Sequence, residues 1–188
     1  MRTVWWVLIG IAVLVLLLFG TYYSTYNDIV RLDEGIDGSW AQVDNVLQRR
    51  YDLIPNLVNT VKGYAAHERE LLEEVTRLRS QWASAGSMQE KVEAAEAMEG
   101  ALARLMVVVE NYPDLKANQN FLALQDELAG TENRIAVERR RYNDAVRQYN
   151  TRIRAIPGAW VAGMSGFERS DAYFEAAAAA REAPRVQF

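Results

Sequence analysis

The chain contains no cysteine and only one histidine, His67, among its 188 residues. Without cysteine it can form no disulfide, no thiolate metal site and no cysteine nucleophile. A zinc site on a helix commonly uses two histidines four residues apart, but the residue four positions after His67 is Leu71. The G-x-S-x-G motif of serine hydrolases and the G-x-x-x-x-G-K-[ST] phosphate loop are also absent. We therefore expect a protein that is not an enzyme, with no metal, cofactor or small-molecule substrate.

The chain also has no excess of basic charge, because it contains 21 Lys and Arg residues and 25 Asp and Glu residues, which gives a net charge of −4. Nucleic-acid-binding proteins favour a basic face, so we expect no nucleic-acid partner. Half of the residues are apolar, and the chain is long enough to bury a sizeable core.

The N-terminal segment has no charged residue from position 4 to position 27, and the stretch VWWVLIGIAVLVLLLFG is almost continuously apolar. A helix needs about 20 such residues to cross a bilayer. A cleaved signal peptide is the alternative, but the following stretch, LFGTYYSTYN, contains no A-x-A-like cleavage site. The retained anchor is favoured because aromatic residues flank the apolar run as interfacial belts do: Trp5, Trp6, Tyr22, Tyr23 and Tyr26.

Charges near the anchor predict its orientation only through a small imbalance. Arg2 and the amino terminus are positive, whereas residues 28–37 contain four acidic residues against one arginine. The positive-inside rule then favours a cytoplasmic N-terminus and a domain outside the cytoplasm.

After the anchor, apolar residues recur three and four positions apart, which is typical of helices packed on partners. The first such row runs from Ile29 to Trp82 and predicts one long helix continuous with the anchor. A capping box at Ser87 and Glu90 predicts the start of a second helix, which ends at the sequence NYPD. A third helix is expected over about 120–155, before the IPG sequence at 156–158.

The predicted fold is all-α, with a transmembrane helix followed by an elongated antiparallel bundle of three to four helices. We divide the chain into a flank (1–3), the anchor (4–25), the bundle (26–157) and a C-terminal part (158–188). The C-terminal part is expected to hold an apolar, glycine-rich loop on the bundle or membrane surface, followed by a short helix over 172–183.

Pro55 lies inside the first predicted helix, where it removes the hydrogen bond to the carbonyl of Tyr51 and favours a kink. Asn56 could bond to the freed carbonyl or to a neighbouring helix. The kink either curves the helix around its bundle, which we favour, or opens a binding site.

His67 and Glu68 look like half of a metal or acid–base site, but the rest of that site is missing. We expect instead that His67 is partly buried beside an ion-pair partner. Arg49 and Arg50, like the arginines at 139–141, are expected on a solvated face that is cross-paired with acidic residues. The alternative is a cationic ring that binds lipid headgroups or an acidic partner.

Aromatic residues are more numerous than a slim bundle needs, and exposed aromatic patches usually mark partner surfaces. The residues concerned are Trp40, Tyr64, Trp82 and Trp160.

Three long stretches resemble the LemA family of bacterial envelope proteins: YDLIPNLVNTVKGYAAHE (51–68), ENYPDLKANQNFLALQDELAGTENRIAVERRRYNDAVRQYN (110–150) and SGFERSDAYFEA (165–176). The resemblance covers the chain from Tyr26 onwards, although the alanine run at 176–180 is unusual for the family. Its family-like positions are Arg49, Arg50, Pro55, Asn56, Tyr64, His67, Glu68, Asn133, Arg134, Arg139, Tyr142, Asn143, Tyr149, Asn150 and Pro157.

The resemblance implies a single-pass protein of the bacterial inner membrane with a helical body and no known catalytic residues. With the aromatic surface, it favours a scaffold or adaptor that self-associates or organises membrane partners, in contact with membrane lipids. The alternatives are an accessory factor that binds a lipid or peptide near Pro55, and a regulator of a membrane protease complex.

Overall fold

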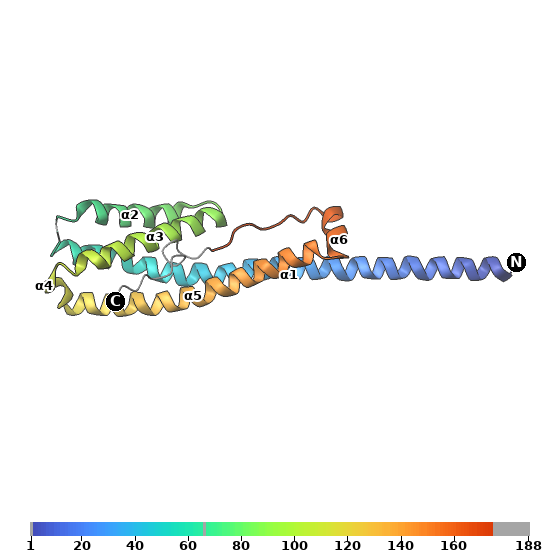
Figure 1. Cartoon of the computed structure of the whole chain (residues 1–188), viewed down its shortest axis with the longest axis horizontal. Helices are drawn as coiled ribbons and strands as arrows, with labels where there is room; N and C mark the ends of the chain where they lie inside the picture. The colour runs from blue at the N-terminus through green and yellow to red at the C-terminus, as the bar shows by residue number, and fades with distance from the viewer. Residues whose placement is uncertain (1, 66, 175–188) are drawn as a thin grey trace, which may run out of the picture. The chain divides into compact units, whose positions relative to one another are not determined.

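A computed structural model describes residues 2–65 and 67–174, and every regular element in these ranges is a helix (Figure 1). The all-α prediction is therefore confirmed. The helices are α1 (Arg2–Lys62), α2 (Arg69–Ser84), α3 (Met88–Val109), α4 (Pro113–Lys116), α5 (Gln119–Arg154) and α6 (Gly158–Ser165).

The described residues divide into two compact units, which we call unit 1 and unit 2. Unit 1 contains residues 2–40 and 141–171, and unit 2 contains residues 41–140 and 172–174. Helices α1 and α5 contribute to both units, because each contains a unit boundary.

Unit 2 is a bundle of four long helical segments from α1, α2, α3 and α5, with α2 and α3 paired as an antiparallel hairpin (Figure 1). Its core follows the predicted apolar rows closely, and on α1 it includes Val43, Leu47, Ile54 and Leu57. The predicted capping box is present, since Ser87 Oγ accepts from the Glu90 amide and Glu90 Oε2 accepts from the Ser87 amide, both at 3.2 Å.

The prediction of one helix from Ile29 to Trp82 is wrong, because α1 ends at Lys62 and α2 begins at Arg69. The chain turns after Gly63, where the amide of Ala65 still bonds to the carbonyl of Val61 at 2.8 Å. Helix α2 buries its own apolar stripe in the same bundle, so the three- and four-residue spacing resumes directly after the turn. Periodicity alone therefore does not reveal the break.

Unit 1 packs the first part of α1 against the end of α5 and against α6. Its core includes Ile29, Ile36, Val146 and Ile153. Among the described residues, α1 is the helix long and apolar enough to cross a membrane, with an 18-residue window of mean hydropathy 2.6 and none of that window buried. The continuous helix from this segment into the body was predicted correctly.

The C-terminal part of unit 1 differs from the predicted loop, because residues Gly158–Ser165 form α6. Gly158 allows the tight approach to α5, since a Cβ there would lie 2.0 Å from the carbonyl oxygen of Arg152. The extended chain after α6 is held by Asn150, whose amide group exchanges two hydrogen bonds with the backbone of Ser170. Of the helix predicted over 172–183, residues 172–174 are not helical, and the remainder lies outside the described residues.

Candidate functional site

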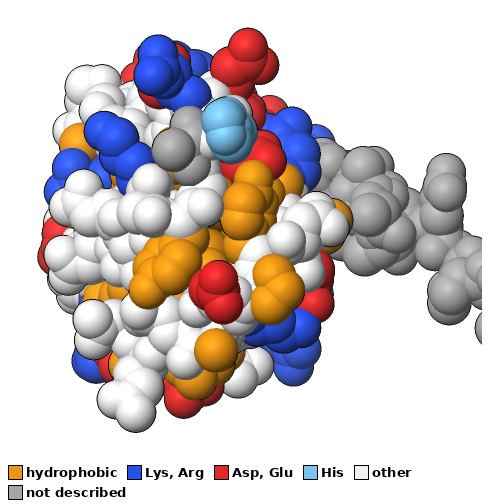
Figure 2. Space-filling view, turned by 90° about the vertical axis from the view of Figure 1, so that its left-hand side faces the viewer, with side chains coloured by type: hydrophobic (Ala, Val, Ile, Leu, Met, Phe, Trp, Pro, Cys, Tyr) orange, Lys and Arg blue, Asp and Glu red, His pale blue; other side chains and the backbone are white. Residues whose placement is uncertain are grey.

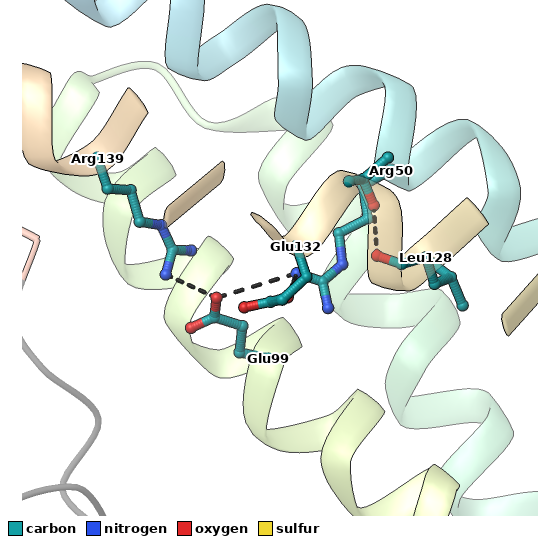
Figure 3. Close-up of polar contacts among 6 residues, drawn as sticks. Arg50, Glu99, Leu128, Glu132 and Arg139 are labelled. Carbon is teal, nitrogen blue, oxygen red and sulfur yellow. Dashed lines mark hydrogen bonds and ion pairs between the residues drawn. The ribbon is translucent and has the colours of Figure 1, made fainter. Parts of the chain in front are cut away.

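Four charged side chains from three helices meet inside unit 2 (Figure 3). Arg50 of α1 pairs with Glu132 of α5 and lies 3.9 Å from the carboxylate of Glu99 on α3. Arg139 of α5 donates a hydrogen bond to the same Glu99 carboxylate at 2.6 Å. We call Arg50, Glu99, Glu132 and Arg139 the charge cluster.

The charge cluster is balanced, with two guanidinium groups and two carboxylates, and its two arginines are largely shielded from water, whereas Glu132 is about half exposed. Arg50 is 8% exposed, and the Arg139 side chain is 14% exposed. The Phe174 ring lies 4.7 Å from the guanidinium carbon of Arg139 and shields it further. Because a buried charge is costly unless it is paired, this arrangement ties α1, α3 and α5 together.

The prediction of a solvated arginine face is consequently wrong for Arg50 and Arg139. The expected cross-pairing with acidic residues is found, as in the pair of Arg50 with Glu132. Arg49 does lie on the surface, where it pairs with Glu127 at 2.6 Å. Position along the helix separates these neighbours, because consecutive residues project about 100° apart.

Tyr51 follows Arg50 on α1, and its carbonyl is the one that loses a helical hydrogen bond because of Pro55. Its ring is buried against Trp82, with ring centroids 4.5 Å apart, and burial raises the pKa of its phenol. The carbonyl of Tyr51, which Pro55 leaves without a helical donor, accepts a hydrogen bond from Arg79 Nε of α2 at 3.0 Å. The donor is therefore a neighbouring helix, and Asn56 is exposed instead.

Glu68 makes a side-chain hydrogen bond in the turn after α1. Tyr112 donates a hydrogen bond from its hydroxyl to Glu68 at 3.0 Å, and this bond raises the pKa of Tyr112. Asn118 caps α5 by accepting from two backbone amides, and its side-chain amide donates to the Tyr64 hydroxyl at 2.9 Å. His67 is exposed, so the predicted partial burial is wrong.

This turn lies at one end of unit 2, beside α4 and the start of α5 (Figure 2). Figure 2 shows hydrophobic side chains in the middle of that end, with His67 in pale blue and charged side chains around them. Tyr64 and Leu122 are 45% and 44% exposed there, and Pro113 is exposed as well. We call Tyr64, His67, Pro113 and Leu122 the end face.

The remaining predicted residues do not join the charge cluster. Trp40 packs edge-on against the buried Tyr142 in unit 1, with centroids 5.5 Å apart. Asn143 is half-buried in the same unit, and Asn133 is exposed on the unit 2 part of α5. Trp82 was predicted as part of an exposed aromatic surface, and this is wrong because it is 4% exposed.

Sequence reasoning missed several partners that lie far away along the chain, namely Arg79, Glu99, Tyr112, Asn118 and Glu127. Glu99 left a signal, because it lies four residues after the buried Ala95 and three before the buried Leu102. A charged residue on such an apolar stripe indicates an internal pair.

A groove of about 630 Å³ lies between α1 and α2, directly after Pro55. Three of its lining residues are basic, Lys62, Arg69 and Arg77, and one is acidic, Glu73. We call it the basic groove. Over the ranges 2–65 and 67–174, no three His, Asp or Glu side chains are grouped so that they could hold a metal ion.

Comparison with known proteins places these features in a family, since residues 39–188 match the family model described as LemA family. The chain belongs to the LemA family. Magnetosome protein MamQ 2 of Paramagnetospirillum magneticum is 27% identical to this LemA-family chain over 82% of the chain and 66% of the relative. Magnetosome protein MamQ of Magnetospirillum gryphiswaldense is 26% identical over 89% of the chain and 72% of the relative.

A third relative carries the family name. Protein LemA of Metamycoplasma hominis is 26% identical over 73% of the chain and 65% of the relative. The LemA-family chain therefore spans just under two thirds of the length of some of its relatives. The family match includes both Arg50 and Arg139, whereas the apolar segment of α1 precedes it.

Proposed function

We propose that this LemA-family protein is a membrane-anchored scaffold or adaptor of the bacterial cell envelope that self-associates or organises membrane partners. The observation that carries the proposal is α1, a single 61-residue helix. Its first part is apolar and unburied, and its second part supplies core residues of unit 2. A helix that is apolar all round suits a lipid environment, whereas the striped part suits a folded body.

The scaffold role draws support from the end face. Exposed apolar side chains gathered on one surface commonly mark contacts with other proteins. The family and relative names do not name a reaction, and the proposal includes none. Following the charge asymmetry around the anchor, it places the body outside the cytoplasm, on the inner membrane.

The test is the mass of the full-length chain in mild detergent, measured for the wild type and two variants. Leu122→Glu places a charge on the end face, where Leu122 is 44% exposed. Val137→Glu is the matched control, because Val137 lies on the same helix with 48% exposure but outside the end face. We expect a defined oligomer or partner complex for the wild type and the control, and a smaller species for Leu122→Glu. A monomer without partners in all three would contradict the scaffold.

A second candidate function, the binding of a lipid or peptide, is favoured by the basic groove. Its mixture of cationic and apolar lining residues suits an amphipathic anion. Mass spectrometry of the purified full-length protein would show a bound lipid or acidic peptide, and Arg77→Glu would release it. A ligand-free monomer would exclude this candidate, whereas a ligand-free oligomer would support the scaffold alone.

A further inference from the structure

Three large apolar side chains on α6 and in the turn just before it are largely exposed. Ile156, Trp160 and Met164 are 71%, 66% and 69% exposed. Trp160 and Met164 are four residues apart and therefore lie on one side of α6, and Ile156 lies in the turn that precedes the helix. The opposite side is packed, because Gly158, Val161 and Ala162 are buried. We call Ile156, Trp160 and Met164 the α6 ridge.

The α6 ridge lies in a stretch that contains no charge, since residues 155–167 include no Asp, Glu, Lys or Arg. Charged residues appear immediately outside it, with Arg152 and Arg154 before it and Glu168 and Arg169 after it. A water-facing helix normally has polar residues on its outer side. The outer side of α6 is instead apolar, with an excess of basic residues at its borders.

Helix α6 also adjoins the end of the apolar segment of α1. The hydroxyls of Tyr22 and Ser165 are 3.1 Å apart, and the rings of Tyr26 and Phe167 lie 5.5 Å apart. On the same part of α1, Phe19 and Tyr23 are 60% and 51% exposed. The apolar surface of α1 thus continues onto α6 near Tyr22 and Tyr26, which lie at the C-terminal end of the apolar segment of α1.

The direction of α6 fits this position. Figure 1 shows α6 standing across α1 rather than along it. If α1 crosses a bilayer, a helix across it lies close to the membrane plane. Interfacial helices lie in the membrane plane in this way, and they bury their apolar side about 5–10 Å into the boundary between headgroups and acyl chains.

We propose that α6 is a second membrane contact, lying in the interface of the bilayer that α1 crosses, with the α6 ridge toward the acyl chains. The inference rests on the proposed function, because it needs α1 as the anchor. Trp160 suits this depth, since tryptophan is enriched at membrane interfaces. Of the arginines that border the charge-free stretch, Arg152 pairs with Asp28 and Arg169 pairs with Asp171, and the exposed Arg154 is the one we expect to contact lipid phosphates.

The test uses the absence of native cysteine, which makes a single introduced cysteine the only thiol of the full-length chain. Met164→Cys carries an environment-sensitive fluorophore, and the protein is reconstituted into vesicles of phosphatidylethanolamine and phosphatidylglycerol. Lipids with a quencher near the headgroup or near the acyl-chain end report the depth of the fluorophore. Two matched positions on α1 are labelled in the same way: Leu14→Cys within the apolar segment and Glu34→Cys beyond it.

At position 164 we expect a blue-shifted emission that the shallow quencher reduces more than the deep one does. Position 14 should be reduced most by the deep quencher, and position 34 by neither. If position 164 behaves like position 34 while position 14 is quenched, the α6 contact is wrong and the anchor stands. A blue-shifted label at position 164 that lipid quenchers do not reach would indicate a protein partner on the α6 ridge and would also overturn the proposal. If position 14 is not quenched, the anchor itself fails.

Discussion

Unit 1 and unit 2 distribute apolar and charged side chains in opposite ways, although α1 and α5 run through both. Among the described residues, most of the exposed large hydrophobic side chains lie in unit 1, whereas unit 2 exposes four, Tyr64, Val107, Leu122 and Val137. Unit 2 in turn encloses Arg50, a charged residue that is 8% exposed. A single helix can therefore be built for two surroundings, apolar on all sides where lipid is expected and striped where it packs on other helices.

The largest expected effect comes from comparing one tryptophan of each unit. Trp82→Ala in unit 2 should lower the free energy of unfolding by about 3–5 kcal/mol, because it removes a fully packed ring from beside Tyr51. Trp160→Ala in unit 1 should change it by less than about 0.5 kcal/mol, because that ring is 66% exposed. Denaturant unfolding of the full-length protein in detergent measures both. Equal losses would remove the distinction between packed and outward-facing aromatics.

The second comparison is between a half-buried and a more exposed carboxylate of unit 2, Glu99 and Glu127. Glu99→Ala should cost about 3 kcal/mol, because Arg139 loses its carboxylate partner in a poorly hydrated site. Glu127→Ala should cost less than about 1 kcal/mol, because its pair with Arg49 is solvent-exposed. Replacing Glu99 and Arg139 together by methionine should recover much of the loss. The charge cluster would have no structural role if the two alanine variants unfolded alike.

A smaller effect tests the contact that accommodates Pro55. Arg79→Met should cost about 1–2 kcal/mol, because the Tyr51 carbonyl loses its donor. In a Pro55→Ala background the helix regains an amide donor for that carbonyl, so Arg79→Met should cost clearly less. A double-mutant cycle measures this coupling. Additive effects would show that Arg79 does not compensate for the proline.

The smallest expected effect is a pH dependence in unit 1. Burial, together with the neighbouring Asp37 and Glu34, raises the pKa of Asp33 above 3.8. The folded state then holds the proton more tightly than the unfolded state, so this contribution to stability falls as the pH rises from 3.8 through the raised pKa. Asp33→Asn should raise the melting temperature at neutral pH and flatten its pH dependence.

Asp28→Asn serves as the control for that variant. Asp28 pairs with Arg152 at 3.1 Å, so its replacement should lower the melting temperature at neutral pH. If both variants shifted the melting temperature in the same direction, the inference that ionised Asp33 destabilises the folded state would be wrong.

The sequence predicted elements better than it predicted contacts between them. Apolar spacing located the long helices, the Ser87–Glu90 capping box located the start of α3, and charge depletion located the apolar segment of α1. The end of α1 at Lys62 could not be predicted from this spacing, because α2 continues the same three- and four-residue recurrence of apolar residues.

The candidate site was harder to predict because its partners are distant along the chain. The sequence singles out Arg50 and Arg139, but it does not show that both approach Glu99, which is supplied by another helix. Likewise, Pro55 predicted a free carbonyl at Tyr51, but only the packing of α2 shows that Arg79 satisfies it. The local sequence therefore indicates which groups need a hydrogen-bond or ion-pair partner, and the tertiary structure shows which residue supplies it.

The central claim, that the apolar segment of α1 is retained as a membrane anchor, is tested most directly by the intact mass of the protein in alkali-washed membranes. We expect the chain in the washed membrane fraction to retain the apolar segment, residues 4–25. A shorter chain that lacks the apolar segment and is released into the wash would contradict it, because that segment would then be a cleaved signal peptide.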